Sequence, residues 1–165
     1  MCDFIKKLFS KLDEETKSIA MKKFADLLTA LKNRTLIYEV YNIRSAPYKK
    51  MRDVQVLQIA DVCVLINAIK KTQYTPESIL NYIKQHFEDY SGIVYVKDSG
   101  TEKFLFVLEK DHYPLCVERW DLIFLDSWGV EQLLVDMCGM ERKSEAEEIS
   151  SQIFTHPRRM YDTLH

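Results

Sequence analysis

Hydrophobic residues in the first 33 positions recur at helical spacing and predict two helices. Opposite a lysine-rich face, the first apolar stripe contains Phe4, Ile5, Leu8, Phe9 and Leu12. The second stripe contains Ala20, Phe24, Leu27, Leu28 and Leu31. A short basic amphipathic helix either packs on its own domain or lies on a membrane surface, and the pattern alone leaves both possibilities open.

A strand-like segment follows the two predicted helices. "TLIYEVYNI", from Thr35 to Ile43, is rich in β-branched and aromatic residues, which favour a strand. The next stretch, from Arg44 to Arg52, contains a proline and four positive charges. Because proline interrupts strand pairing and clustered charges favour solvent, we expect a loop there.

Two helices are predicted in the middle of the chain. The stretch from Asp53 to Lys71 has a helical pattern in its second half, with Asp61 as the expected N-cap. Further on, Thr75 can cap a helix whose first residue is Pro76. Both helices carry an apolar stripe and are therefore expected to pack on a core.

The last third of the chain predicts antiparallel strands followed by helices. The expected elements are a hairpin over Gly92–Asp111 that turns at Asp98-Ser99-Gly100, a second hairpin within His112–Gly129, a helix that ends at Gly139, a polar helix over 143–154 and a loose tail. The order predicts an α+β fold: N-terminal helices, a central helix packed on an antiparallel β-sheet, and C-terminal helices. We expect one domain over 1–165, with a helical N-terminal extension (1–33), an α+β core (35–140) and a helical or loose tail (141–165).

Composition and charge narrow the classes of function. The chain is 47% hydrophobic and 29% charged, and 23 basic residues against 25 acidic ones give a net charge of −2. Since a general nucleic-acid binder needs a basic surplus, no nucleic-acid partner is expected. No apolar run has the length of a membrane span, and the start lacks a signal-peptide pattern, so we expect a cytoplasmic protein without a membrane span.

The four cysteines and four glycines limit which disulfides, metal sites and catalytic sites can be expected. Cys2, Cys63, Cys116 and Cys138 are widely spaced, with no CxxC pair, so neither a disulfide framework nor a metal site is expected, and no cofactor is indicated. Few glycines leave few positions for the unusual dihedral angles of active-site loops, which disfavours an enzyme.

One arrangement of residues nevertheless suggests nucleophilic catalysis. His112 begins the stretch "HYPLCVERWDLIFLDSWG", and Asp126 closes its second strand-like run. A hairpin register centred on Arg119 would pair His112 directly with Asp126, whereas a two-residue turn at Arg119-Trp120 would put them on opposite faces. Cys63 is the best candidate nucleophile, because it is expected in the first turn of a helix, where the dipole favours a thiolate.

These residues resemble a known family. "LQIADVCVLINAI" is similar to the start of papain-like cysteine peptidases, especially the C39-type (double-glycine) branch, and "HYPLCVERWDLIFLDSWG" is similar to its later histidine and aspartate segments. The resemblance covers about residues 56–129. It implies a peptidase or amidase in which Gln58 donates to the oxyanion, Cys63 is the nucleophile, His112 the base and Asp126 the orienting group, or an inactive relative of such an enzyme.

A second resemblance concerns a different cysteine. The order His, Asp, Gln, Cys-Gly is also that of SUMO-type deconjugating peptidases, with Gln132 six residues before Cys138. Cys138 follows Asp126 by only twelve positions, which leaves no room for the helices that this family places between them. We therefore rank this resemblance below the first.

The same residues also have purely structural interpretations. His112 would begin a strand, Asp126 or Ser127 would cap the following helix, and Cys63 would be a small buried residue. The alternative function is then a non-enzymatic binding protein, such as an inhibitor, immunity or phage-type accessory protein, with a protein or peptide partner. Nine tyrosines suit a protein–protein interface, because tyrosine offers a large and rigid contact area.

Overall fold

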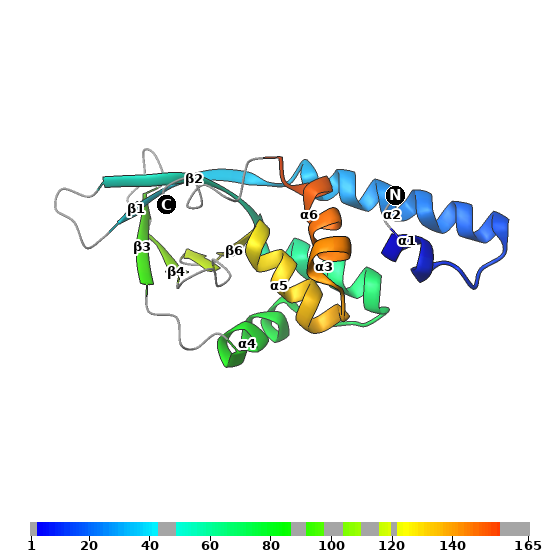
Figure 1. The fold of residues 1–165 in the computed structure, drawn as a ribbon. Helices are drawn as coiled ribbons and strands as arrows, with labels where there is room; N and C mark the ends of the chain where they lie inside the picture. Colours follow the sequence, from blue (N-terminus) through cyan, green and yellow to red (C-terminus); the bar gives the residue numbers. More distant parts are fainter. Residues whose placement is uncertain are drawn as a thin grey trace.

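A computed structural model describes residues 3–42, 49–86, 92–97, 104–109, 116–119 and 122–155 and has an α+β fold, which confirms the predicted class. The helical elements are α1 (Asp3–Leu8), α2 (Glu14–Lys32), α3 (Ile59–Lys70), α4 (Pro76–His86), α5 (Ser127–Cys138), the π-helical segment η1 (Arg142–Ala146) and α6 (Glu147–Ile153). The strands are β1 (Leu36–Asn42), β2 (Lys49–Gln58), β3 (Gly92–Lys97), β4 (Phe104–Glu109), β5 (Cys116–Arg119) and β6 (Leu122–Asp126). The strands lie at one end of the molecule and the helices at the other (Figure 1).

The described strands form one antiparallel sheet that closes on itself in the order β1-β2-β6-β5-β4-β3. β1 pairs with β2 along its whole length, and the register shifts between Val40 and Tyr41. Tyr41 also pairs with Tyr95 of β3, which joins the two ends of the strand order. An irregularity of this kind bends and twists a strand, so it suits the place where β1 turns toward β3.

The pairing of β2 with β6 brings two helices together. Val56 of β2 pairs with Asp126 of β6, and each strand leads without a loop into a helix, β2 into α3 and β6 into α5. Neighbouring strands lie about 5 Å apart, so the first turns of α3 and α5 start close to each other. This junction between the sheet and the helices contains the described members of the predicted triad.

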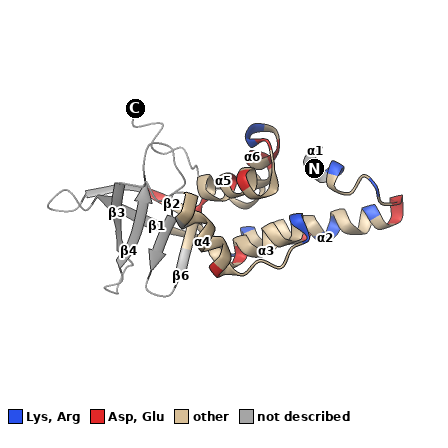
Figure 2. Cartoon of the chain, turned by 90° about the horizontal axis from the view of Figure 1, so that it is seen from below, with Lys and Arg blue, Asp and Glu red and all other residues tan. Residues whose placement is uncertain are grey.

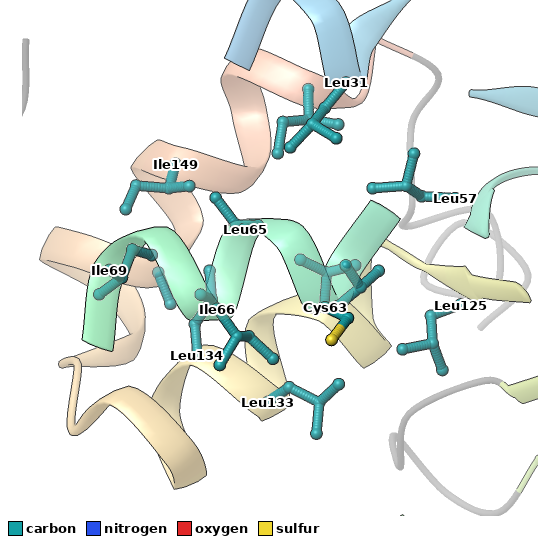
Figure 3. Packing of buried hydrophobic residues seen from close by; sticks show 14 of the residues in the cluster. Leu31, Leu57, Cys63, Leu65, Ile66, Ile69, Leu125, Leu133, Leu134 and Ile149 are labelled. Carbon is teal, nitrogen blue, oxygen red and sulfur yellow. The ribbon is translucent and has the colours of Figure 1, made fainter. Parts of the chain in front are cut away.

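The hydrophobic core is centred on α3. Leu65 and Ile66 of this helix are fully buried, and they lie between Leu133 and Leu134 of α5 on one side and Ile149 of α6 on the other (Figure 3). Complete burial of each such side chain contributes about 1.5–3 kcal/mol. The central helix is therefore held on several sides by apolar contacts.

Part of the first apolar stripe packs on the domain itself, since Leu8 and Phe9 contact the core whereas Leu12 is exposed. The Phe9 ring, which follows α1 directly, is buried with its centroid 6.3 Å from that of Phe24 in an edge-on arrangement. The Lys71 ammonium lies 5.8 Å from the centroid of the same ring. Phe9 thus contacts the core, as the first of the two sequence-based alternatives predicts. Among the described helices, none has the length and apolar character needed to cross a membrane.

The C-terminal end of the described chain is tied to β2. The buried Gln55 side chain accepts a hydrogen bond from the Thr155 main-chain N–H at 2.9 Å and donates one to Thr35 Oγ1 at 2.6 Å. One carboxamide therefore links the residue before β1 to the second residue after α6. Such a buried polar group is stabilising because both its donor and its acceptor have partners.

Most element predictions agree with the structure, and two need correction. Residues 49–52 belong to β2 rather than to a loop, because β1 offers them hydrogen-bond partners up to Asn42. Asp61 is not the N-cap of α3, which begins at Ile59; instead it accepts a 2.8 Å bond from Arg34 Nε. The predicted turn at 98–100 and the tail from 156 onward lie outside the described residues.

The polar helix predicted over 143–154 is also more complex in the structure. The segment begins with the π-helical turn η1, and regular α6 follows it directly. By contrast, Gly139 has the left-handed conformation (φ 67°) expected at the end of a helix, and it caps α5 as predicted.

Candidate functional site

The predicted catalytic residues that the structure describes gather at the junction of sheet and helices. Gln58 ends β2, Cys63 lies in the second turn of α3, and Asp126 ends β6. His112 lies outside the described residues. The described hydrogen bonds of Cys63 and Asp126 do not join these residues to each other, and each has a separate local partner.

The Cys63 thiol is a buried donor. Its side chain is 3% exposed, and Sγ lies 3.0 Å from the main-chain oxygen of Tyr74, to which the thiol donates. Asn67 Nδ2 lies 3.5 Å from the same sulfur. Burial raises the pKa of the Cys63 thiol, and the Asn67 hydrogen bond lowers it by a smaller amount. The neutral thiol is therefore the favoured form.

The position of Cys63 on α3 also differs from the expected one. Since α3 begins at Ile59 rather than after Asp61, Cys63 lies in the second turn, one turn further from the positive end of the helix dipole. The dipole effect falls off within the first turn. The helix consequently gives little help to a thiolate at this position.

Asn67 organises the surroundings of Cys63. Its Nδ2 donates to the Tyr74 main-chain oxygen at 2.9 Å, and its Oδ1 accepts from the Tyr74 N–H at 2.9 Å and from Thr72 Oγ1 at 2.8 Å. One carboxamide thus satisfies both main-chain groups of Tyr74. This arrangement fixes the connection between α3 and α4, and it places the acceptor for the Cys63 thiol.

Asp126 caps α5. Its side chain is 2% exposed, and Oδ1 accepts a 2.9 Å hydrogen bond from the Gly129 main-chain N–H. This is the capping role that the structural interpretation of the sequence predicts for Asp126. A carboxylate at a helix N-terminus also interacts favourably with the dipole.

The second hairpin has a register that differs from both sequence-based alternatives. Cys116 pairs with Leu125 and Arg119 with Leu122, so the hairpin is centred between residues 120 and 121. A direct pairing of His112 with Asp126 required a centre at Arg119. Residues 112–115 lie outside the described part of the chain, and the position of the imidazole stays a prediction.

Gln58, the predicted oxyanion donor, occupies the N-cap position of α3. Its side chain makes no capping hydrogen bond, and the residue is half-buried. No hydrogen bond joins its carboxamide to another residue of the described segments. The amide is thus available for a ligand or solvent, whereas the Cys63 thiol donates its hydrogen bond to the Tyr74 main-chain oxygen.

A groove of about 380 Å³ lies between α3, α4 and α5. Its lining includes Lys70, Tyr74, Asn81, Tyr82, Gln85 and Asp136. On α4, Asn81, Tyr82 and Gln85 share one face, while Ile79 and Ile83 are buried on another. The amphipathic pattern of α4 therefore turns its polar and aromatic side chains toward the groove.

The two tyrosines of the groove have defined neighbours. The Lys70 ammonium lies 3.3 Å from the Tyr74 hydroxyl and 5.5 Å from the centroid of its ring. Tyr82 stacks on His86 with ring centroids 3.9 Å apart. Burial, and secondarily the negative charge of Asp136, raises the pKa of Tyr82, so its hydroxyl stays a donor at neutral pH.

Sequence reasoning did not single out these groove residues. The signal available was the spacing of Ser78, Asn81, Tyr82 and Gln85, which places them on one face of a predicted helix. Nothing in the local sequence pattern indicated that α3 and α5 would line the same groove as α4. As for metals, the described residues contain no group of three or more His, Cys, Asp or Glu side chains that could hold an ion.

Comparisons with protein families, with curated proteins and with solved structures found no match to this chain.

Proposed function

We propose that this protein is a non-enzymatic binding protein that acts through a protein–protein interface. The observation that carries the proposal is the state of Cys63: its thiol is buried, donates to the Tyr74 carbonyl and has a raised pKa. A nucleophilic cysteine needs the opposite conditions, namely access to substrate and a stabilised thiolate. Cys63 thus has the properties of a structural residue.

The groove between α3, α4 and α5 supports an interface at this place. Two half-buried tyrosines, Tyr74 and Tyr82, line it together with side chains of both charge signs. Tyrosine is enriched at the centres of protein interfaces because it combines a large apolar area with a hydroxyl donor. Basic and acidic residues are both present on the described helices (Figure 2), which suits a protein partner better than a nucleic acid.

A papain-like cysteine hydrolase, or an inactive relative of one, is the alternative. It is supported by the placement of Gln58, Cys63 and Asp126 at one junction, where β2 and β6 pair. In that mechanism the Cys63 thiolate would attack an amide or thioester carbonyl, His112 would protonate the leaving group, and Gln58 would donate to the oxyanion.

The proposal includes a cytoplasmic location. It is supported by the two thiols described as free, Cys63 and Cys138. Free thiols persist in reducing compartments, whereas oxidising ones favour disulfides.

Affinity capture of partners from cells that express the protein separates the two functions. Wild type and Cys63→Ala are immobilised at equal density, and the bound proteins are quantified by mass spectrometry. The proposal expects the same partner at the same yield on both, because Cys63 lies in the core and not at the interface. A hydrolase would instead form a thiol-linked adduct with substrate-derived probes on wild type alone, and that result would contradict the proposal.

A further inference from the structure

Two opposite charges line the groove between α3, α4 and α5 without neutralising each other. Lys70 is at the end of α3 and Asp136 on α5, and both are exposed. Each has a neutral partner: the Lys70 ammonium bonds the Tyr74 hydroxyl, and Asp136 accepts from the Gln132 carboxamide at 2.9 Å. No ion pair joins the two charges within the described segments. A ligand with one anionic and one cationic group would therefore find a counter-charge for each.

The α4 side of the groove carries two carboxamides with free hydrogen-bonding capacity. Asn81 and Gln85 are exposed, and no hydrogen bond joins either side chain to another described residue. A carboxamide offers both a donor and an acceptor, which is the complement of a peptide group. Tyr82 lies on the same helix face, and its stacking on His86 fixes the ring as a flat contact surface.

The spacing of these carboxamides matches an extended chain. Residues four apart on an α-helix are separated by about 6 Å along its axis. An extended peptide repeats every two residues, at about 6.6 Å. A strand laid along α4 would thus present successive peptide groups of the same orientation to Asn81 and Gln85.

We propose that this groove binds an extended peptide segment of the partner, with an acidic side chain at Lys70 and a basic side chain at Asp136. The inference rests on the proposed function and deepens it by naming the kind of partner segment. The volume of about 380 Å³ is within the range of ligand-binding pockets. A nucleic acid fits less well, because its phosphates would meet Asp136 as well as Lys70.

Selection from a displayed library of short random peptides, with the full-length chain as bait, tests the proposal. Enriched peptides should carry one acidic and one basic residue at a constant separation. Their affinities are then measured by fluorescence anisotropy. We expect the double variant Asn81→Ala/Gln85→Ala to bind at least about tenfold more weakly, since two hydrogen bonds are lost. Gln73→Ala, an exposed position outside the groove lining, is the matched control and should bind as wild type does.

Charge reversal tests the polarity of the site. Lys70→Glu should weaken binding of the selected peptides by about tenfold, whereas the exposed Lys23→Glu on α2 should leave it unchanged. The exchanged variant Lys70→Glu/Asp136→Lys should prefer peptides in which the acidic and basic positions are swapped. Circular dichroism checks that every variant is folded, and a purely structural role of these residues would not produce swapped preferences.

Three results would overturn the inference. They are the absence of any enriched peptide, enrichment without the paired charges, and peptide binding that the groove variants leave intact. Partner capture distinguishes these failures from failure of the proposed function. If the groove variants capture the cellular partner as wild type does, the binding function stands and its location in this groove is wrong.

Discussion

The Sγ atom of Cys63 lies 3.0 Å from the main-chain oxygen of Tyr74, so the second turn of α3 is bonded to the residue directly before the cap of α4. The same oxygen accepts from Asn67 Nδ2 at 2.9 Å. The cysteine that the sequence suggested as a nucleophile thus belongs to a hydrogen-bonded connection between two helices. This relationship underlies the predictions for the candidate site.

Asn67→Ala should destabilise the fold by about 2–3 kcal/mol, because both main-chain groups of Tyr74 and the Thr72 hydroxyl lose a partner. Asn67→Asp should also destabilise it at neutral pH, because a carboxylate cannot donate to the Tyr74 oxygen. Urea unfolding measures both effects. Asn81→Ala, an exposed asparagine on α4, is the control and should change the free energy of unfolding by less than about 0.5 kcal/mol. Equal stability of the Asn67 and Asn81 variants would refute the role of Asn67.

Asp126→Ala should lower stability by about 1–2 kcal/mol, since the Gly129 N–H at the start of α5 loses its acceptor. Asp126→Asn should cost less, because asparagine is an equally good N-cap. Thermal unfolding of the two variants gives the comparison. A larger loss for asparagine than for alanine would mean that the carboxylate charge, and not the cap, is what the position requires.

Arg142→Ala should destabilise the contact of η1 with α5. The guanidinium lies 3.4 Å from Glu131, a carboxylate that is almost fully buried, and stacks 4.6 Å above the Trp128 ring. Its removal should cost about 2–3 kcal/mol, because the buried Glu131 carboxylate loses one of its partners, the Arg142 guanidinium. Glu131→Gln/Arg142→Met should be more stable than Arg142→Ala. Lys143→Ala, at an exposed position on η1, should leave stability unchanged. Chemical denaturation should rank Lys143→Ala as the most stable of the three variants and Arg142→Ala as the least stable.

Cys138 should make stability fall in alkaline solution. Burial raises its pKa from 9.0 to about 11, against a smaller opposing effect of Lys70. The folded state therefore holds the proton more tightly than the unfolded state. Its contribution is fully present below pH 9.0 and is lost as the pH rises through about 11. The loss is about 2 kcal/mol. Cys138→Ala should reduce this slope of unfolding free energy against pH, and an unchanged slope would contradict the assignment.

Sequence reasoning succeeded where the signals are local. Thr75 and Pro76 predicted the start of α4, and in the structure Thr75 Oγ1 accepts from the Ser78 N–H at 3.2 Å while Ser78 Oγ accepts from the Thr75 N–H at 3.0 Å. Gly139 likewise predicted the end of α5. Capping depends on residues three or four apart, so it can be read without knowledge of the tertiary fold.

Sequence reasoning failed where residues far apart in the chain determine the local structure. Asp61 has the properties of an N-cap, but it pairs with Arg34, twenty-seven positions earlier in the chain. The register of the second hairpin could not be predicted from the sequence. Trp120 and Asp121, between the paired residues Arg119 and Leu122, lack the glycine or asparagine signals of a tight turn. The groove depends on how α3, α4 and α5 meet, which no single segment specifies.

The most direct test of the account is the rate at which iodoacetamide alkylates Cys63 near neutral pH. Mass spectrometry of the Cys63 peptide follows the folded full-length protein, with glutathione as the reference thiol. Because the thiol is buried, bonded to Tyr74 and raised in pKa, we predict alkylation at least about tenfold slower than that of glutathione. His112→Ala should leave this rate unchanged. Alkylation faster than that of glutathione, slowed by His112→Ala, would show an activated nucleophile and contradict the binding-protein account.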